Sequence, residues 1–265
     1  MLEVNKIYCM DNVQGMRQLD NESVDLVVTS PPYDNLRNYN GFSFDFENVA
    51  KELFRIVKVG GVVVWVVGDA TINGSETGTS FKQALYFMQV GFNLHDTMIY
   101  AKENVFVHDP RNKRYKQAFE YMFVFSKGKP NTYNEIKDKI VKNSGKEIKT
   151  QKGRNPNGEK RFMKEPVAMG EYQARFNIWS YNTGIFSATD KIAFSHPAIF
   201  PEQLVKDHIL SWSNEGDVVL DPFMGSGTTA KVARALNRKY IGFEISQQYV
   251  DLANKRLQET KTLFD

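Results

Sequence analysis

Cysteine, long apolar runs and a surplus of one charge are all scarce in this chain of 265 residues. The single cysteine, Cys9, excludes an internal disulfide and any zinc site made of several cysteines. The longest apolar run, at 62–67, has the length of a strand and is too short to cross a bilayer. With no evident secretory leader, these absences predict a reducing, cytoplasmic setting and no membrane partner. Because Cys9 lies in an apolar strand, we expect an inert, buried thiol.

The net charge of +3 says little about partners, but the charge is unevenly distributed along the chain. Residues 137–164 hold ten Lys or Arg and three Asp or Glu, so this stretch is +7 and the rest of the chain is −4. A charged run of this kind is often no more than a solvated surface. The imbalance favours contact with a phosphate-bearing partner instead.

Strand and helix patterns alternate in two parts of the chain. Strands are predicted at 7–10, 25–29, 62–67, 94–101, 119–126, 218–220 and 240–243, and helices at 13–19, 46–57, 81–90, 201–212, 227–236 and 246–258. Gly60-Gly61 is expected to end the helix at 46–57. The alternation predicts an α/β fold with a parallel sheet and a functional site at the carboxyl ends of its strands. Polar residues that fall there are Asp11, Ser30, Asp69, Asp221 and Glu244.

A glycine-bearing turn joins a strand to a helix in the sequence VVLDPFMGSGTTAKVA, residues 218–233. Gly225 and Gly227 let the backbone come close to a ligand, and the helix N-terminus that follows suits a carboxylate. The next strand ends in Glu244, where an acid can hold the two hydroxyls of a ribose. This combination predicts an adenosine-containing cofactor, with a ligand-free tight turn as the alternative. A P-loop is disfavoured because the required Lys is missing.

A rigid exit follows the strand at 25–29, where the chain reads Ser30-Pro31-Pro32-Tyr33. Two consecutive prolines fix the backbone and donate no hydrogen bonds. Taken alone, this segment is also compatible with a stiffened strand exit beside an incidental tyrosine.

Together the two motifs resemble those of DNA amino-methyltransferases that use S-adenosylmethionine. Residues 221–229 resemble their cofactor turn and residues 30–33 their catalytic motif. The catalytic motif comes first, as in the permuted beta class, and the resemblance covers roughly residues 1–125 and 178–260. It implies a circularly permuted, Rossmann-like methyltransferase sheet with an inserted target-recognition region. The expected parts are a catalytic half at 1–126, the basic target-recognition region at 127–184 and a cofactor-binding half at 185–265.

The resemblance also implies the residues of the site. The catalytic set is Ser30, Pro31, Pro32 and Tyr33. The cofactor-binding set is Asp11, Phe200, Pro201, Asp221, Pro222, Phe223, Gly225, Ser226, Gly227, Thr228 and Glu244, and no metal is expected. Phe200 and Pro201 come from HPAIFPEQL at 196–204, which looks like the segment beside the methionine end of the cofactor. Asp11 is alternatively a helix cap, and Asp69 is either a site residue or an ordinary loop residue.

The Ser-Pro-Pro-Tyr motif suits methylation of an amine. The lone pair of an exocyclic amine is delocalised into the base, so fixed acceptors for its N–H bonds favour a more nucleophilic nitrogen. We expect the Ser30 hydroxyl and the Pro31 carbonyl to be these acceptors. Tyr33 is expected to stack on a base that has been flipped out of the duplex.

The target base and the partners follow from the same resemblance. Ser at the first motif position is more typical of cytosine-N4 enzymes and Asp or Asn of adenine-N6 enzymes, so cytosine is favoured and adenine stays open. Double-stranded DNA is the expected substrate, with base edges read by candidates such as Asn143, Gln151, Asn155 and Asn157. A cognate restriction endonuclease is a candidate functional partner, and a monomer or homodimer is expected. The alternatives are an RNA or protein-amide methyltransferase and a non-catalytic DNA-binding module.

Overall fold

The computed structural model describes residues 2–32, 44–105, 113–142, 144–145, 147–148, 151–162, 167–168, 170–184, 187–190 and 199–259. It divides into two compact units. The main unit comprises Met1–Asn134 and Asn177–Asp265, and the second unit is Glu135–Phe176. None of the helices in these ranges is both long enough and apolar enough to cross a membrane.

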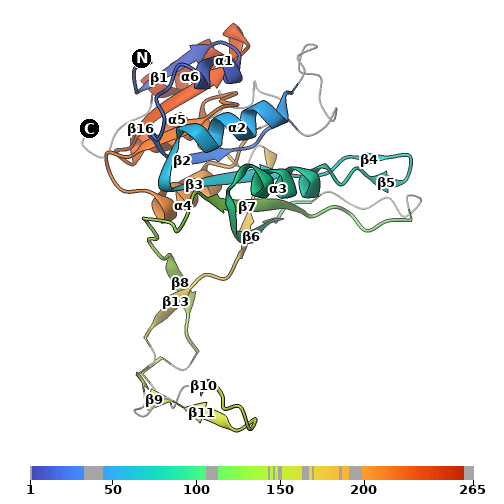
Figure 1. The fold of residues 1–265 in the computed structure, drawn as a ribbon, viewed down its shortest axis with the longest axis vertical. Helices are drawn as coiled ribbons and strands as arrows, with labels where there is room; N and C mark the ends of the chain where they lie inside the picture. Colours follow the sequence, from blue (N-terminus) through green and yellow to red (C-terminus); the bar gives the residue numbers. More distant parts are fainter. Residues whose placement is uncertain are drawn as a thin grey trace. The chain divides into compact units, whose positions relative to one another are not determined.

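An eight-stranded sheet forms the centre of the main unit (Figure 1). In spatial order its strands are β1 (Lys6–Cys9), β16 (Lys239–Glu244), β15 (Val218–Asp221), β2 (Val24–Thr29), β3 (Val57–Val67), β7 (Phe119–Ser126), β6 (Asn93–Lys102) and β14 (Ile178–Tyr181). Strand β7 is antiparallel to both neighbours, and all other pairs are parallel. The sheet is therefore mixed, which corrects the wholly parallel sheet expected from the sequence.

The helices in the described ranges cover the sheet in two series (Figure 1). Helices α1 (Asn12–Met16), α2 (Phe46–Ile56) and α3 (Thr79–Val90) pack in succession, as do α4 (Glu202–Trp212), α5 (Thr228–Ala235) and α6 (Gln247–Gln258). The connections of the first series step across the sheet in one direction and those of the second in the other. Right-handed crossovers therefore place the two series on opposite faces. A short hairpin, β4 (Thr71–Ile72) with β5 (Ser75–Glu76), precedes α3.

Apolar side chains at strand and helix spacing explain these layers. The central strand β3 is buried on both faces from Gly60 to Val67, in keeping with its continuous apolar run at 62–67. Helix α2 buries Val49, Leu53 and Ile56, which lie at helical spacing, against the sheet. Trp65 is fully buried between these layers and packs on Phe87 with ring centroids 5.0 Å apart.

The second unit, which we call the basic ribbon (residues 135–176), carries three short antiparallel strand pairs in the part that the structure describes. These pairs are nested in the sequence: β8 (Lys137–Ile140) with β13 (Tyr172–Ala174), β9 (Glu147–Ile148) with β12 (Val167–Ala168), and β10 (Gln151–Arg154) with β11 (Lys160–Phe162). The chain reverses at 155–159, where the Asn155 amide donates to the Glu159 carbonyl. The ribbon is shorter than the basic region at 127–184, because β14 pairs with β6 in the main sheet and residues 127–134 also belong to the main unit.

Two local expectations are wrong. Helix α2 ends at Ile56, and the Gly60-Gly61 pair lies inside β3, where Gly60 has φ +82° beside a break in register with β2. Cys9 is exposed rather than buried, because β1 is an edge strand of the sheet.

Candidate active site

The two sequence motifs meet at one edge of the sheet. Strands β2 and β15 are parallel neighbours, with Leu26 opposite Val219 and Val27 opposite Leu220. Their carboxyl ends therefore lie side by side, and Ser30 follows Thr29 at the end of β2 just as the glycine turn follows Asp221 at the end of β15. Pro31 is buried, and Ser30 and Pro32 are half-buried. The fold thus brings Ser30, Pro31 and Pro32 next to the predicted cofactor turn, whereas Tyr33 lies outside the described residues.

Asp221 joins the two motifs directly. The Thr29 hydroxyl donates to one carboxylate oxygen of Asp221 at 2.6 Å, and the Thr229 hydroxyl donates to the other at 2.7 Å. The Phe223 amide donates a third bond at 3.0 Å. Burial raises the pKa of Asp221 to about 6, although these three bonds act in the opposite direction. The carboxylate is therefore engaged within the protein, and in this geometry it supports the turn.

The glycine turn itself has the conformation that only glycine adopts easily. Gly225 and Gly227 have φ of +50° and +83°, and a Cβ on Gly227 would lie 2.6 Å from the Cβ of Ala253 in α6. Gly227 is also the N-cap residue of α5, so no capping side chain covers the first amides of that helix. Pro222, Ser226 and Thr228 are buried within the same turn, while Phe223 is half-buried and its ring lies 6.1 Å from that of Trp65.

Glu244 closes the other side of the turn. Its Oε2 accepts from the Gly225 amide and its Oε1 from the Ser246 amide, both at 2.9 Å. Burial raises the pKa of Glu244, and these backbone bonds oppose the shift. Each carboxylate oxygen can accept two hydrogen bonds, so Glu244 keeps capacity for hydroxyl donors. An uncapped helix N-terminus beside such an acid fits a ligand that carries both a carboxylate and a ribose.

Three other predicted residues have identifiable structural neighbours. Asp11 follows β1, whose Cys9 is paired with Glu244, and its side chain caps α1 by accepting from the Gln14 amide at 2.9 Å. Phe200 is half-buried, and Pro201 is buried at the N-cap position of α4. Asp69, which the sequence leaves as either a site residue or a loop residue, accepts from the Ser80 amide at 2.9 Å at the start of α3.

Sequence reasoning missed two residues at this edge. Thr29 is a fully buried polar residue at the end of an apolar strand, which is the signal that could have identified it. Arg256 is fully buried on α6 between Ala253 and Leu257, so a charged residue falls on the apolar face of a helix.

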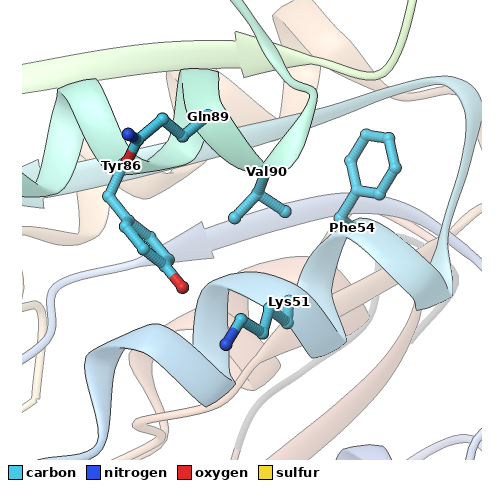
Figure 2. Close-up of a pocket in the computed structure, with 5 residues that line it drawn as sticks. All are labelled: Lys51, Phe54, Tyr86, Gln89 and Val90. Atoms are coloured by element: carbon cyan, nitrogen blue, oxygen red, sulfur yellow. The ribbon is translucent and has the colours of Figure 1, made fainter.

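A groove elsewhere on the molecule is not part of this site. Figure 2 shows it between α2 and α3, lined by Lys51, Phe54, Tyr86, Gln89 and Val90. All five residues lie on the two helices and none on the strand-end turns, so the groove contributes nothing to the chemistry of those turns.

The N6/N4 methyltransferase family, described as DNA methylase, matches residues 24–255. The chain belongs to this family. The orphan methyltransferase M.BamHII of Bacillus amyloliquefaciens is 61% identical over 239 residues, 89% of each chain. The type II methyltransferase M.HinfI of Haemophilus influenzae is 32% identical over 290 residues, 97% of this chain and 69% of that protein.

Solved structures of DNA methyltransferases share the fold. The PvuII DNA methyltransferase, which is cytosine-N4-specific, has a TM-score of 0.69 and 21% identity over 94% of this chain and 85% of that chain. A DNA modification methylase of Thermus thermophilus, in its complex with S-adenosyl-L-methionine, has a TM-score of 0.63 and 24% identity over 96% and 95% of the two chains. The predicted family and the predicted Rossmann-like, permuted fold are confirmed. This protein is a DNA methyltransferase of the N6/N4 amino-methylating family.

Proposed function

We propose that this DNA methyltransferase methylates N4 of cytosine within a specific duplex sequence, with adenine N6 as the alternative. S-adenosylmethionine is the methyl donor. The observation that carries the proposal is the contact between β2 and β15, which puts Ser30 and Pro31 beside the turn at 222–228. We assign that turn and Glu244 to the cofactor, with the uncapped start of α5 facing its carboxylate.

When bound, the cofactor supplies a methyl group that is already activated on a sulfonium. The protein must therefore align the amine and accept hydrogen bonds from its N–H groups. The Ser30 hydroxyl and the Pro31 carbonyl are the proposed acceptors, and two prolines hold them in place before the reaction. Thr29 adds a further restraint, because its hydroxyl bond to Asp221 fixes the end of β2. Preorganised acceptors of this kind stabilise the charge that develops on the amine during transfer.

Support for cytosine comes from Ser30, since serine at this position is more typical of cytosine-N4 enzymes than of adenine-N6 enzymes. The test is methylation of a plasmid followed by modification-aware sequencing, which identifies the base and its sequence context together. A mark on adenine would replace cytosine N4 by adenine N6 and leave the rest of the mechanism intact. Protection of the methylated plasmid from a restriction endonuclease would identify the functional partner.

Ser30→Ala tests the role of the catalytic motif. We expect turnover to fall at least 100-fold while the Kd for the cofactor changes less than about threefold, because the missing hydroxyl acts on the amine in the transition state. Turnover close to that of the unsubstituted enzyme would remove Ser30 from the mechanism.

We propose the basic ribbon as the element that contacts duplex DNA. Its 42 residues hold eleven Lys or Arg against six Asp or Glu, a net charge of +5. Near the reversal of the chain, Arg154 and Lys160 are exposed and directly paired across the two strands, and Arg161 is exposed on the following position. The major groove of B-DNA admits a two-stranded β-ribbon, and cations at its end can meet the phosphates.

Neutralising the three cations near the reversal tests this contact. In Arg154→Gln/Lys160→Gln/Arg161→Gln, we expect the slope of log K against log salt to become shallower by about 0.9 for each phosphate that is no longer neutralised. A matched control carries three exposed lysines of the main unit replaced by glutamine: Lys82, Lys239 and Lys255. Equal slopes in the two triple variants would place the DNA on another surface.

A further inference from the structure

One buried arginine lies directly behind the proposed cofactor turn. The Arg256 side chain, from α6, is completely buried. Its Nη1 lies 2.6 Å from the backbone carbonyl oxygen of Ser226, and the Ser226 and Thr228 hydroxyls are 3.1 Å and 3.2 Å away. Neighbouring Ala253 lies against Gly227. Helix α6 therefore approaches the turn through two residues one helical turn apart.

The other edge of the same guanidinium binds two carboxylates. Nε lies 3.1 Å from both oxygens of Asp190, and Nη2 is 3.0 Å from Asp190 and 2.9 Å from Glu202. Lys231, from α5, lies 2.6 Å from Asp190 and 2.7 Å from Glu202. These four side chains comprise two cations and two anions, so their formal charges cancel within a largely buried space.

We infer that Arg256 is a positioning residue, which fixes the backbone of the cofactor turn relative to Asp190 and to Glu202 at the start of α4. Phe200 and Pro201 directly precede Glu202, so one guanidinium connects both stretches assigned to the cofactor. This inference rests on the assignment of those stretches in the proposed function. A turn with two left-handed glycines loses much conformational freedom on binding, and a turn that is already fixed binds more tightly.

Only an arginine has the shape that these contacts need. The planar guanidinium presents N–H donors on two edges, one toward a carbonyl and one toward a pair of carboxylates. A lysine at 256 would keep the charge but would not bridge the two edges. A glutamine would also remove the charge that Arg256 sets against Asp190 and Glu202.

The experiment compares Arg256→Gln and Arg256→Lys with matched variants of a second buried arginine. Arg238 is 9% exposed and donates to Ser213 and to the Leu236 carbonyl, away from the turn. For each full-length variant we would measure the urea midpoint, the Kd for S-adenosylmethionine by calorimetry, and amide hydrogen exchange at 224–228. We expect Arg256→Gln to raise the cofactor Kd at least 10-fold and to speed exchange in the turn. The cofactor Kd of Arg256→Lys should lie between those of Arg256→Gln and the unsubstituted enzyme. Arg238→Gln should change the Kd less than twofold.

The outcomes separate this inference from the proposed function. If the unsubstituted enzyme binds the cofactor and folded Arg256→Gln binds it equally well, the positioning role is wrong and the proposed function stands. If Arg238→Gln weakens binding as much as Arg256→Gln, the effect is general destabilisation and the inference is again overturned. If the unsubstituted enzyme does not bind S-adenosylmethionine, the proposed function itself fails. Should Arg256→Gln not fold, Glu202→Gln removes one contact of the fork, and an unchanged Kd there would overturn the inference.

Discussion

The buried carboxyl group of Asp221 makes the stability of the protein depend on pH in a direction opposite to that of most paired acids. Asp221 is 2% exposed and accepts hydrogen bonds from Thr29, Thr229 and Phe223. Its burial raises its pKa from 3.8 to about 6, and the charge of Glu244 adds to the rise. The informative substitution is Asp221→Asn, which keeps the shape of the side chain and removes its titration.

The magnitude follows from the shift in pKa. Between pH 3.8 and pH 6 the folded protein retains a proton on Asp221 that the unfolded chain has already released. Raising the pH through this interval therefore lowers the stability of the unsubstituted protein. The shift of roughly two units, at about 1.4 kcal/mol for each, corresponds to about 3 kcal/mol. Stability from this group is fully present below pH 3.8 and has disappeared by about pH 7.

Urea unfolding at several pH values measures this effect. The fluorescence of the three buried tryptophans, Trp65, Trp179 and Trp212, reports the transition. We expect the free energy of unfolding of the unsubstituted protein, minus that of Asp221→Asn, to fall by about 3 kcal/mol from pH 3 to pH 7 and then to stay level. Groups that titrate in both proteins cancel in this difference. A difference that is flat, or that rises with pH, would refute the reasoning.

Three further substitutions have effects that urea unfolding can measure. Thr29→Val removes the hydroxyl bond to Asp221 and should cost about 1.5–3 kcal/mol, so a decrease under about 0.5 kcal/mol would show that the bond contributes little. Gly227→Ala adds a Cβ that would lie 2.6 Å from the Cβ of Ala253, at a residue with φ +83°. It should lower the free energy of unfolding by about 1–3 kcal/mol or more, whereas unchanged stability would contradict the close approach. Burial lowers the pKa of His208 from 6.5 to about 3. As the pH falls from 6.5 to 3, the free energy of unfolding of the unsubstituted protein should therefore decrease by about 1.4 kcal/mol per pH unit relative to that of His208→Leu. A difference in unfolding free energy that stays constant with pH would contradict this.

Much of the main unit could be predicted because its elements are locally determined. The continuous apolar run of β3 and the helical spacing of Val49, Leu53 and Ile56 in α2 place both elements without tertiary information. The orientation of β7 could not be obtained this way, because a strand carries the same side-chain pattern in either direction. The basic ribbon gave no clear pattern either, since its described pairs are only two to four residues long.

The residues of the candidate site also separate into those that a local pattern locates and those that it does not. The glycine turn and Glu244 could be located because each motif is contiguous and lies next to a predicted strand. The hydrogen bond between Thr29 and Asp221 joins residues 192 positions apart, and the bonds of Arg256 reach 66 residues back to Asp190. No local pattern contains such partners. The proposed role of Tyr33 stays a prediction, as that residue lies outside the described part of the chain.

The placement of β15 between β2 and β16 has a consequence for biosynthesis. On the ribosome, β2 emerges early and can pair with β3, but its other edge has no neighbour until the segment near Asp221 is made, 192 residues after Thr29. At about 5–20 residues per second, this interval lasts roughly 10–40 s. During that time the nascent polypeptide presents an unpaired apolar edge, the kind of surface that associates with other chains and that chaperones bind. Translation must therefore proceed past Asp221 and β16 before the central sheet can close.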